Sequence, residues 1–221
     1  MVGFINGART GGAKKVFCRF FVDFFSRNGK VAFIILLFIA VFRLSDIAMG
    51  IMANPFYLDM GYTKTEIANV AKVFGFFMSI AGSLICGVLV VKWGLMRPLF
   101  IGAVAVAVTN LLFASLSLME PKVSYLAIVI SADNISGGFA ATAFIAYLSS
   151  LTNRAYTATQ YALFSSLMTL PGKFISGFSG LVVDNFGYFE FFVVAAMLGI
   201  PAILLVVWLS GYERAQLASQ P

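Results

Sequence analysis

Six long apolar stretches dominate this 221-residue chain. A helix needs about 20 predominantly apolar residues to cross the hydrocarbon core of a bilayer, and each stretch is long enough. The chain is 61% hydrophobic and only 11% charged, whereas a soluble domain has about 25% charged residues. The sequence therefore predicts an all-α membrane protein with six transmembrane helices, near residues 31–53, 66–91, 98–118, 122–150, 158–183 and 189–210.

The connections between these stretches are too short to hold a soluble domain. Asn54-Pro55 is expected to end the first helix, and Thr63 and Glu66 have the spacing of a capping box before the second. Residues 1–30 form a basic leader with an aromatic cluster and no cleavage-site pattern, which predicts a cytosolic segment resting at the membrane interface. Residues 31–210 are the transmembrane domain, and residues 211–221 are a cytosolic tail.

The distribution of basic residues predicts the orientation. One side of the membrane would collect ten Lys and Arg, six of them in the leader, and the other side only Lys64 and Lys122. Because Lys and Arg are retained on the cytosolic side, both termini are expected in the cytosol. The net charge of +6 therefore indicates a solvated cytosolic face rather than a nucleic-acid interface.

An internal repeat is visible in two turns. Residues 87–94 (GVLVVKWG) follow the second helix, and residues 180–187 (GLVVDNFG) follow the fifth. Both read G-x-x-V-x-x-x-G with an aromatic residue before the last glycine, and they would lie on opposite sides of the membrane. This is the pattern of two inverted three-helix repeats, as in the six-helix halves of many secondary transporters.

Several enzyme classes are excluded by composition. The chain has no histidine, so a His-centred triad and most zinc sites are ruled out. Its two cysteines, Cys18 in the leader and Cys86 in an apolar run, are expected at different levels and not bonded to each other. We expect no enzyme activity, no metal and no cofactor.

Five ionisable residues lie within the expected helices: Arg43, Asp46, Lys72, Asp133 and Lys173. A charge inside a bilayer costs a few kcal/mol or more unless it is paired or faces water, so each is a candidate functional residue. The formal charges of these five residues sum to +1, which favours an anionic solute. Arg43 and Asp46 share a helix face at i,i+3 spacing, either as a self-neutralised structural pair or as a solute-binding cation beside a protonatable acid.

The remaining candidates lie in the fourth and fifth helices. A buried carboxyl group binds a proton more readily than an exposed one, so Asp133 is a candidate for proton coupling, or else a strut to a neighbouring helix. Lys173 follows Pro171-Gly172, which we expect to interrupt the fifth helix beside a buried cation. The predicted solute-binding residues are Arg43, Lys173, Asn134 and Gln160, and the predicted proton-coupling residues are Asp46 and Asp133.

Several sequence runs together resemble a known family: FRLSDIAMG at 42–50, NPFY at 54–57, KVFG at 72–75, AYLSS at 146–150 and ATQYAL at 158–163. They are similar to the AmpG-type muropeptide permeases of the major facilitator superfamily, over about residues 20 to 210. The resemblance implies proton-driven import of anhydromuropeptides across the bacterial inner membrane for peptidoglycan recycling. The acetyl-coenzyme A transporters are similar to a lesser degree.

The chain departs from this family in two respects. Val91 stands where the superfamily's loop motif has an aspartate, although Lys92, Gly94 and Arg97 are kept. The chain also has only six expected helices, so it resembles the C-terminal half of a major facilitator, and a second six-helix half or a second copy is the expected partner. The alternatives are another anionic-solute transporter, a non-transporting membrane subunit, a gene remnant or, least favoured, a membrane-embedded transferase.

Overall fold

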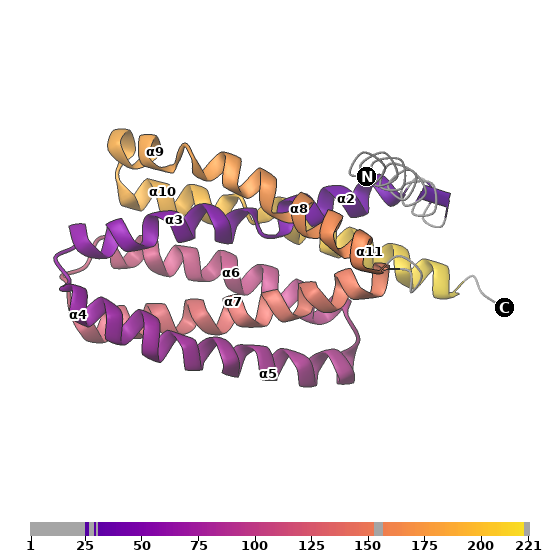
Figure 1. The fold of residues 1–221 in the computed structure, drawn as a ribbon, viewed down its shortest axis with the longest axis horizontal. Helices are drawn as coiled ribbons and strands as arrows, with labels where there is room; N and C mark the ends of the chain where they lie inside the picture. The colour runs from indigo at the N-terminus through magenta and orange to yellow at the C-terminus, as the bar shows by residue number, and fades with distance from the viewer. Residues whose placement is uncertain (1–24, 27–28, 30, 153–156, 219–221) are drawn as a thin grey trace, which may run out of the picture.

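A computed structural model describes residues 25–26, 29, 31–152 and 157–218, with the side chains of 157–160 and 216–218 excepted. Within this part of the chain the regular structure is entirely helical (Figure 1). The principal elements are α2 (Val31–Phe42), α3 (Leu44–Asp59), α4 (Lys64–Ile67), the π-helix η1 (Ala68–Phe74), α5 (Gly75–Trp93), α6 (Met96–Leu116), α7 (Val123–Leu151), α8 (Thr157–Ser176), α9 (Ser179–Phe186), α10 (Tyr188–Met197) and α11 (Ile200–Ala218).

Six helical segments are long and apolar enough to cross a membrane, which confirms the predicted number. We number them spans 1 to 6 in chain order: Val31–Asp59, Lys64–Trp93, Met96–Leu116, Val123–Leu151, Tyr161–Phe186 and Tyr188–Ala215. The chain is therefore a multi-pass membrane protein. The start of α2 and the end of α11 lie at the same end of the bundle, as an even number of spans requires (Figure 1).

Two proline residues were expected to end or interrupt helices, and both expectations are wrong. Helix α3 continues through Pro55 to Asp59, and α8 continues through Pro171 to Ser176. A proline inside a helix removes one backbone hydrogen bond, and membrane helices tolerate this where neighbouring groups compensate. Span 5 is interrupted later, between α8 and α9.

The beginning of span 2 combines a predicted cap with an unpredicted π-helix. The Thr63 amide donates to Glu66 Oε2 at 2.8 Å, and the Glu66 amide donates to Thr63 Oγ1 at 3.2 Å, which confirms the capping box. The π-helix η1 follows, and at its end the Gly75 amide donates to Val70 O, five residues back. Such π-helical segments occur often near functional sites, but no residue type in the sequence marks this one.

The contacts that spans 1, 2 and 3 make have equivalents among the contacts that spans 4, 5 and 6 make. Span 2 packs along span 4 as span 5 packs along span 1, and span 3 packs on span 4 as span 6 packs on span 1. Spans 3 and 6 pack on each other. Exchanging spans 1, 2 and 3 with spans 4, 5 and 6 therefore preserves the principal contacts, as two inverted three-helix repeats require. This is the architecture of half a major facilitator fold.

The two repeated turns close their helices identically. Gly94 ends α5 with φ of 76°, and Gly187 ends α9 with φ of 90°, a region that favours glycine. In each turn the last glycine's amide donates to the carbonyl of the shared valine of the motif, Val90 or Val183. The ends of α5 and α9 lie at opposite ends of the bundle (Figure 1). The sequence repeat therefore corresponds to a structural repeat.

Small residues allow spans 2 and 4 to approach closely. A β-carbon added at Gly82 would lie 2.1 Å from Ile135 O, and one added at Gly138 would lie 2.2 Å from Ser79 O. Neither distance is sterically possible, so only glycine fits at this crossing. Close approach through small residues is typical of membrane helices.

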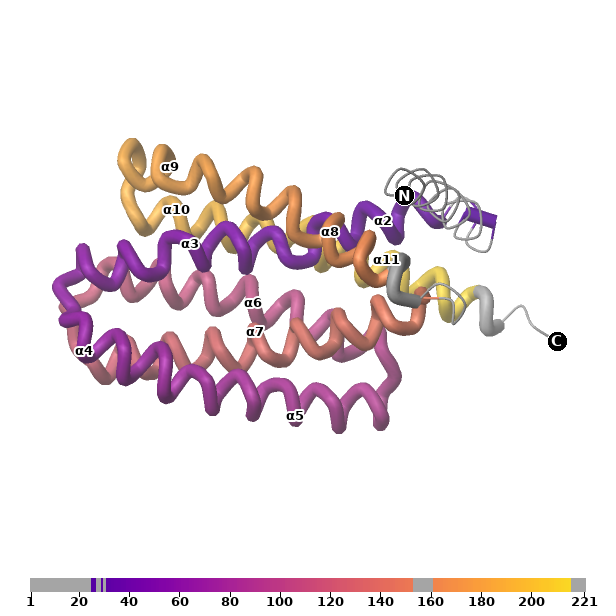
Figure 2. Tube along the Cα trace, in the orientation of Figure 1, coloured from indigo at the N-terminus to yellow at the C-terminus, as the bar shows by residue number. Residues whose placement is uncertain are grey.

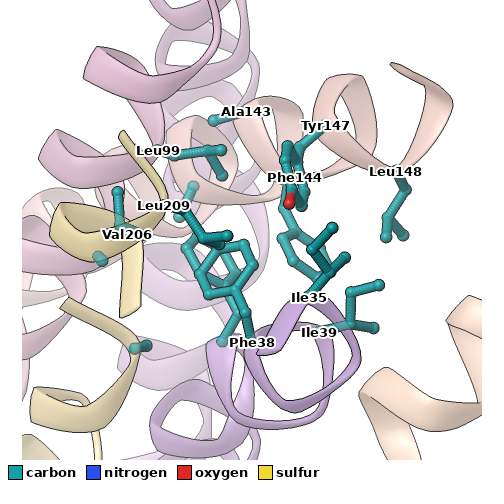
Figure 3. Close-up of a cluster of buried hydrophobic side chains, with 14 of the residues drawn as sticks. Ile35, Phe38, Ile39, Leu99, Ala143, Phe144, Tyr147, Leu148, Val206 and Leu209 are labelled. Atoms are coloured by element: carbon teal, nitrogen blue, oxygen red, sulfur yellow. The ribbon is translucent and has the colours of Figure 1, made fainter. Parts of the chain in front are cut away.

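Aromatic side chains hold spans 1 and 4 together near the end of the bundle that carries α2 and α11. The Phe38 ring makes edge-to-face contacts with the rings of Phe144 and Tyr147, with centroid distances of 5.9 and 5.4 Å (Figure 3). Phe42 stacks on Phe144 at 4.4 Å. Leu209 of α11 joins this buried cluster. Spans 1, 4 and 6 are thereby joined beside the predicted charged residues.

Candidate functional site

The middle of span 1 is broken at the first predicted site residue. Helix α2 ends at Phe42, α3 begins at Leu44, and Arg43 lies between them with φ of −95° and ψ of 3° (Figure 2). The Arg43 guanidinium donates to Asp46 Oδ2 in an ion pair between part-buried side chains. The pairing predicted from i,i+3 spacing is therefore present, at mid-depth in the bundle.

This ion pair borders a small pocket enclosed by four spans. Its walls are mostly small residues, and its volume is about 10 Å³, about enough for one water molecule. The lining residues from spans 1, 3, 4 and 6 are Phe42, Arg43, Ser45, Asp46, Ala103, Val106, Ala140, Gly199 and Ala202. The pocket therefore joins the two inverted repeats at the level of the ion pair.

Asp133 of span 4 lies in the same interior region. Its Oδ1 accepts a hydrogen bond from Thr109 Oγ1 at 3.3 Å, and Thr109 Oγ1 is 3.4 Å from Ser136 Oγ. The adjacent Asn110 donates to Ser45 Oγ at 2.7 Å, which links this region to the segment of span 1 that carries Arg43 and Asp46. The structure thus brings together three of the six predicted site residues, one cation and two acids.

Asn134 is next to Asp133 in sequence but faces another helix. Its Oδ1 accepts a hydrogen bond from Ser79 Oγ at 3.0 Å, and its Nδ2 donates to Ile130 O at 2.8 Å. A β-carbon at Gly75 would lie 2.9 Å from the Asn134 amide nitrogen, so the two helices are tightly packed around this side chain. Asn134 is part of the contact between spans 2 and 4, apart from the charged group.

Lys173 lies outside this interior region. Its side chain is exposed on span 5, while the adjacent Gly172 packs against Ile47 of span 1. The expectation of a buried cation is therefore wrong for the six-helix bundle, because the buried face of α8 is occupied by Gly172 and Ser176. The side chain of Gln160 falls outside the described residues.

A neutral polar network beside the charged group was missed by the sequence analysis. Asn110 Nδ2 donates to Ser45 Oγ at 2.7 Å, and Ser45 Oγ donates to Ala195 O at 2.6 Å. Asn110 is fully buried, and its Oδ1 has no hydrogen-bond partner within the described part of the chain. The available signal was the adjacent polar pair Thr109-Asn110 in the apolar third span, because such residues need partners inside a membrane.

The chemistry of this region is ionic and hydrogen-bonding. Among the described residues, no three acidic or cysteine side chains gather closely enough to hold a metal ion. Cys86 is a free, buried cysteine. The arrangement consists of a guanidinium–carboxylate ion pair and a second carboxylate that accepts a hydrogen bond from a hydroxyl group.

The relatives reported below, found by comparison with known proteins, are all named as AmpG transporters. No family model matches the chain. A Rickettsia felis protein named as a transporter, AmpG 4, is 35% identical over 86% of this chain and 45% of its own length. The proteins named as transporter AmpG 1 from Rickettsia bellii and Rickettsia conorii are 35% and 32% identical, over 81% and 91% of this chain and 44% and 49% of their own lengths. The chain therefore spans about half the length of these relatives.

Proposed function

Because the chain is a half-length AmpG-like protein with six apolar helices, we propose that it acts as one half of a proton-coupled transporter for an anionic solute. The resemblance implies anhydromuropeptides, which carry peptide carboxylates, as the solute. Import across a bacterial inner membrane for peptidoglycan recycling, with both termini in the cytosol, is the corresponding physiological role. Transport is the activity that the related proteins are named for.

The observation that carries this proposal is the charged group between spans 1 and 4. One guanidinium, Arg43, pairs with Asp46, and Asp133, whose carboxylate accepts a hydrogen bond from Thr109 of span 3, is the second acid of the same interior region. With all three groups ionised the set carries −1, so a single proton on either carboxyl group neutralises it. A site with this charge balance is suited to taking up one proton per cycle.

The ion pair also gives a route by which proton and solute are coupled. When Asp46 is protonated, Arg43 loses its negative partner, and a carboxylate of the solute can replace it. When the solute leaves, Asp46 releases its proton and the pair re-forms. Charge-assisted hydrogen bonds between arginine and carboxylates are strong, so each state has a satisfied guanidinium.

We infer a second six-helix unit from the exposed surfaces of the bundle. Spans 2 and 5 bury only 17% of their most apolar windows, less than the other spans. Lys173 on span 5 is exposed, and a lysine facing lipid at this depth costs a few kcal/mol or more. A separate half or a second copy that covers span 5 would place Lys173 beside a solute pathway, as the sequence predicts.

Uptake of a labelled anhydromuropeptide tests this function directly. The chain is expressed in cells that lack their own uptake system, with its membrane abundance measured in parallel. Asp133→Asn and Arg43→Ala are expected to abolish uptake, and Lys173→Ala to reduce it at least tenfold. Lys72→Ala is the matched control, since Lys72 is another exposed lysine within a span, and it is expected to leave uptake unchanged.

The results separate the competing functions. Uptake that survives both Asp133→Asn and Arg43→Ala would contradict the proposed role of the charged group. Absence of uptake by an abundant, membrane-inserted chain would favour a non-transporting subunit. Competition by acetyl-coenzyme A, with no effect of muropeptides, would identify a different anionic solute. Crosslinking through a C-terminal tag would show whether the chain pairs with itself or with another half.

A further inference from the structure

A groove on the outer surface of the bundle lies between the first turns of α6 and the last turns of α11. It has a volume of about 340 Å³ and lies at the end of the bundle where α11 ends (Figure 1). Phe100, Val207 and Trp93 are among its walls, and all three are exposed. An exposed apolar groove on a membrane protein is in contact with lipid chains.

Two arginines lie in this groove. Arg97 comes from the first turn of α6, and Arg214 comes from the end of α11. No acidic residue lines the groove, and within the described residues neither arginine has an acidic partner at salt-bridge distance. The neighbouring Glu213 does not line the groove. The groove is therefore positively charged and apolar at once.

Aromatic residues place this groove at the level of the lipid headgroups. Trp93 lines it, and Trp208 stacks on Tyr212 with ring centroids 5.6 Å apart on the adjacent surface of α11. Trp and Tyr gather at membrane–water interfaces because one end of each ring is polar. A phosphate held by Arg97 and Arg214 would lie at this level, with its acyl chain along the apolar wall.

We propose that this groove binds one anionic phospholipid, with the headgroup phosphate on Arg97 and Arg214 and an acyl chain against Phe100 and Val207. Ser210 lines the same groove; its hydroxyl donates to Val207 O at 2.9 Å, so its oxygen is left to accept a hydrogen bond from a headgroup hydroxyl. The chain provides its own comparison at the opposite end of the bundle, where an apolar groove between spans 3 and 4 has no basic lining residue. Lys122 lies 5.6 Å from the ring centroid of Tyr125, which lines this second groove, but Lys122 pairs with Glu120 at 3.4 Å. The second groove should therefore bind lipid chains without preference for charge.

The two tryptophans of the chain make this testable by fluorescence. Trp208→Phe leaves Trp93, which lines the groove, as the single tryptophan, and phenylalanine keeps a ring against Tyr212. The full chain is reconstituted in vesicles that contain dibrominated phosphatidylglycerol or dibrominated phosphatidylcholine, whose bromine atoms quench nearby tryptophan. We expect stronger quenching by the anionic lipid, and a preference that falls as the salt concentration rises.

Three single substitutions then test which basic residues cause the preference for the anionic lipid. Arg97→Gln and Arg214→Gln are each expected to lower the preference for the anionic lipid about fivefold, which corresponds to roughly 1 kcal/mol per basic residue. Lys92→Gln removes the same charge at the same end of the bundle, from a residue that does not line the groove, and should change the preference less than twofold. Tyr125→Trp, made without Trp93 and Trp208, reports on the second groove, where the nearby Lys122 is paired with Glu120, and should show no preference.

Two outcomes would overturn the site. Equal quenching of Trp93 by the two lipids would exclude selective binding of an anionic headgroup. An effect of Lys92→Gln as large as that of Arg97→Gln would show general attraction of lipid to a basic surface, with no specific groove. Because the salt titration retains both arginines, it tests charge dependence even where a substitution impairs folding.

Discussion

The crossing of spans 2 and 4 gives the sharpest quantitative prediction. Gly138 lies against the backbone of α5, and a β-carbon there would lie 2.2 Å from Ser79 O. A β-carbon at the preceding Gly137 would meet nothing within 4 Å. We therefore predict that Gly138→Ala destabilises the bundle and that Gly137→Ala does not.

The magnitude follows from the geometry. Non-bonded heavy atoms prefer separations of about 3.5 Å, so the helices must part by roughly 1 Å, which forfeits about a quarter to a half of each dispersion contact. Overpacking of this kind costs about 3 kcal/mol at its upper end, which applies here because a backbone carbonyl cannot swing aside. Alanine is favoured over glycine in a helix by about 1 kcal/mol. The expected net loss for Gly138→Ala is about 2 kcal/mol, against a gain of up to about 1 kcal/mol for Gly137→Ala.

The free energy of unfolding is measured by titrating dodecyl sulfate into mixed micelles and following helical circular dichroism. Gly82→Ala should resemble Gly138→Ala, because its β-carbon would lie 2.1 Å from Ile135 O. If Gly138→Ala unfolds at the same detergent fraction as Gly137→Ala, the helices are not in backbone contact and the reasoning is refuted.

Three further substitutions test local features by the same titration. Thr63→Ala removes the cap of span 2 and should cost about 1 kcal/mol; an unchanged stability would mean that the cap is replaced by solvent. Gly94→Ala places a β-carbon at φ of 76° and ψ of −173° and should cost about 1–3 kcal/mol, whereas Gly87→Ala, with no atom near its β-carbon, should not destabilise. Ser45→Ala leaves the buried Asn110 amide without its acceptor and should cost about 1–3 kcal/mol; a smaller loss would indicate another acceptor.

Local signals in the sequence were sufficient for the spans and for one functional contact. Apolar length identified all six spans, and the capping box followed from the spacing of Thr63 and Glu66. The ion pair of Arg43 and Asp46 was predictable because both partners lie on one turn of helix. Each of these features depends on residues that are neighbours in the chain, so no knowledge of the tertiary fold was needed.

Features that depend on a second helix were not predictable. Asn110 and Ser45 are 65 residues apart in the sequence. Neither side chain is ionisable, so the presence of charge within an apolar stretch does not identify them. The exposure of Lys173 depends on which face of α8 contacts span 1, and Gly172 and Ser176 take that face. The continuation of helices through Pro55 and Pro171 depends on neighbours that compensate a lost hydrogen bond, which a single sequence does not reveal.

The inverted packing leaves the bundle without an intrinsic top and bottom. Its turns at Gly94 and Gly187 are equivalent, and exchanging its two halves preserves the principal contacts. An upside-down copy would therefore pack as well as an upright one. The placement of a few lysines and arginines selects the orientation of such a bundle during membrane insertion. Surface mutations that leave the core unchanged can therefore alter its orientation in the membrane.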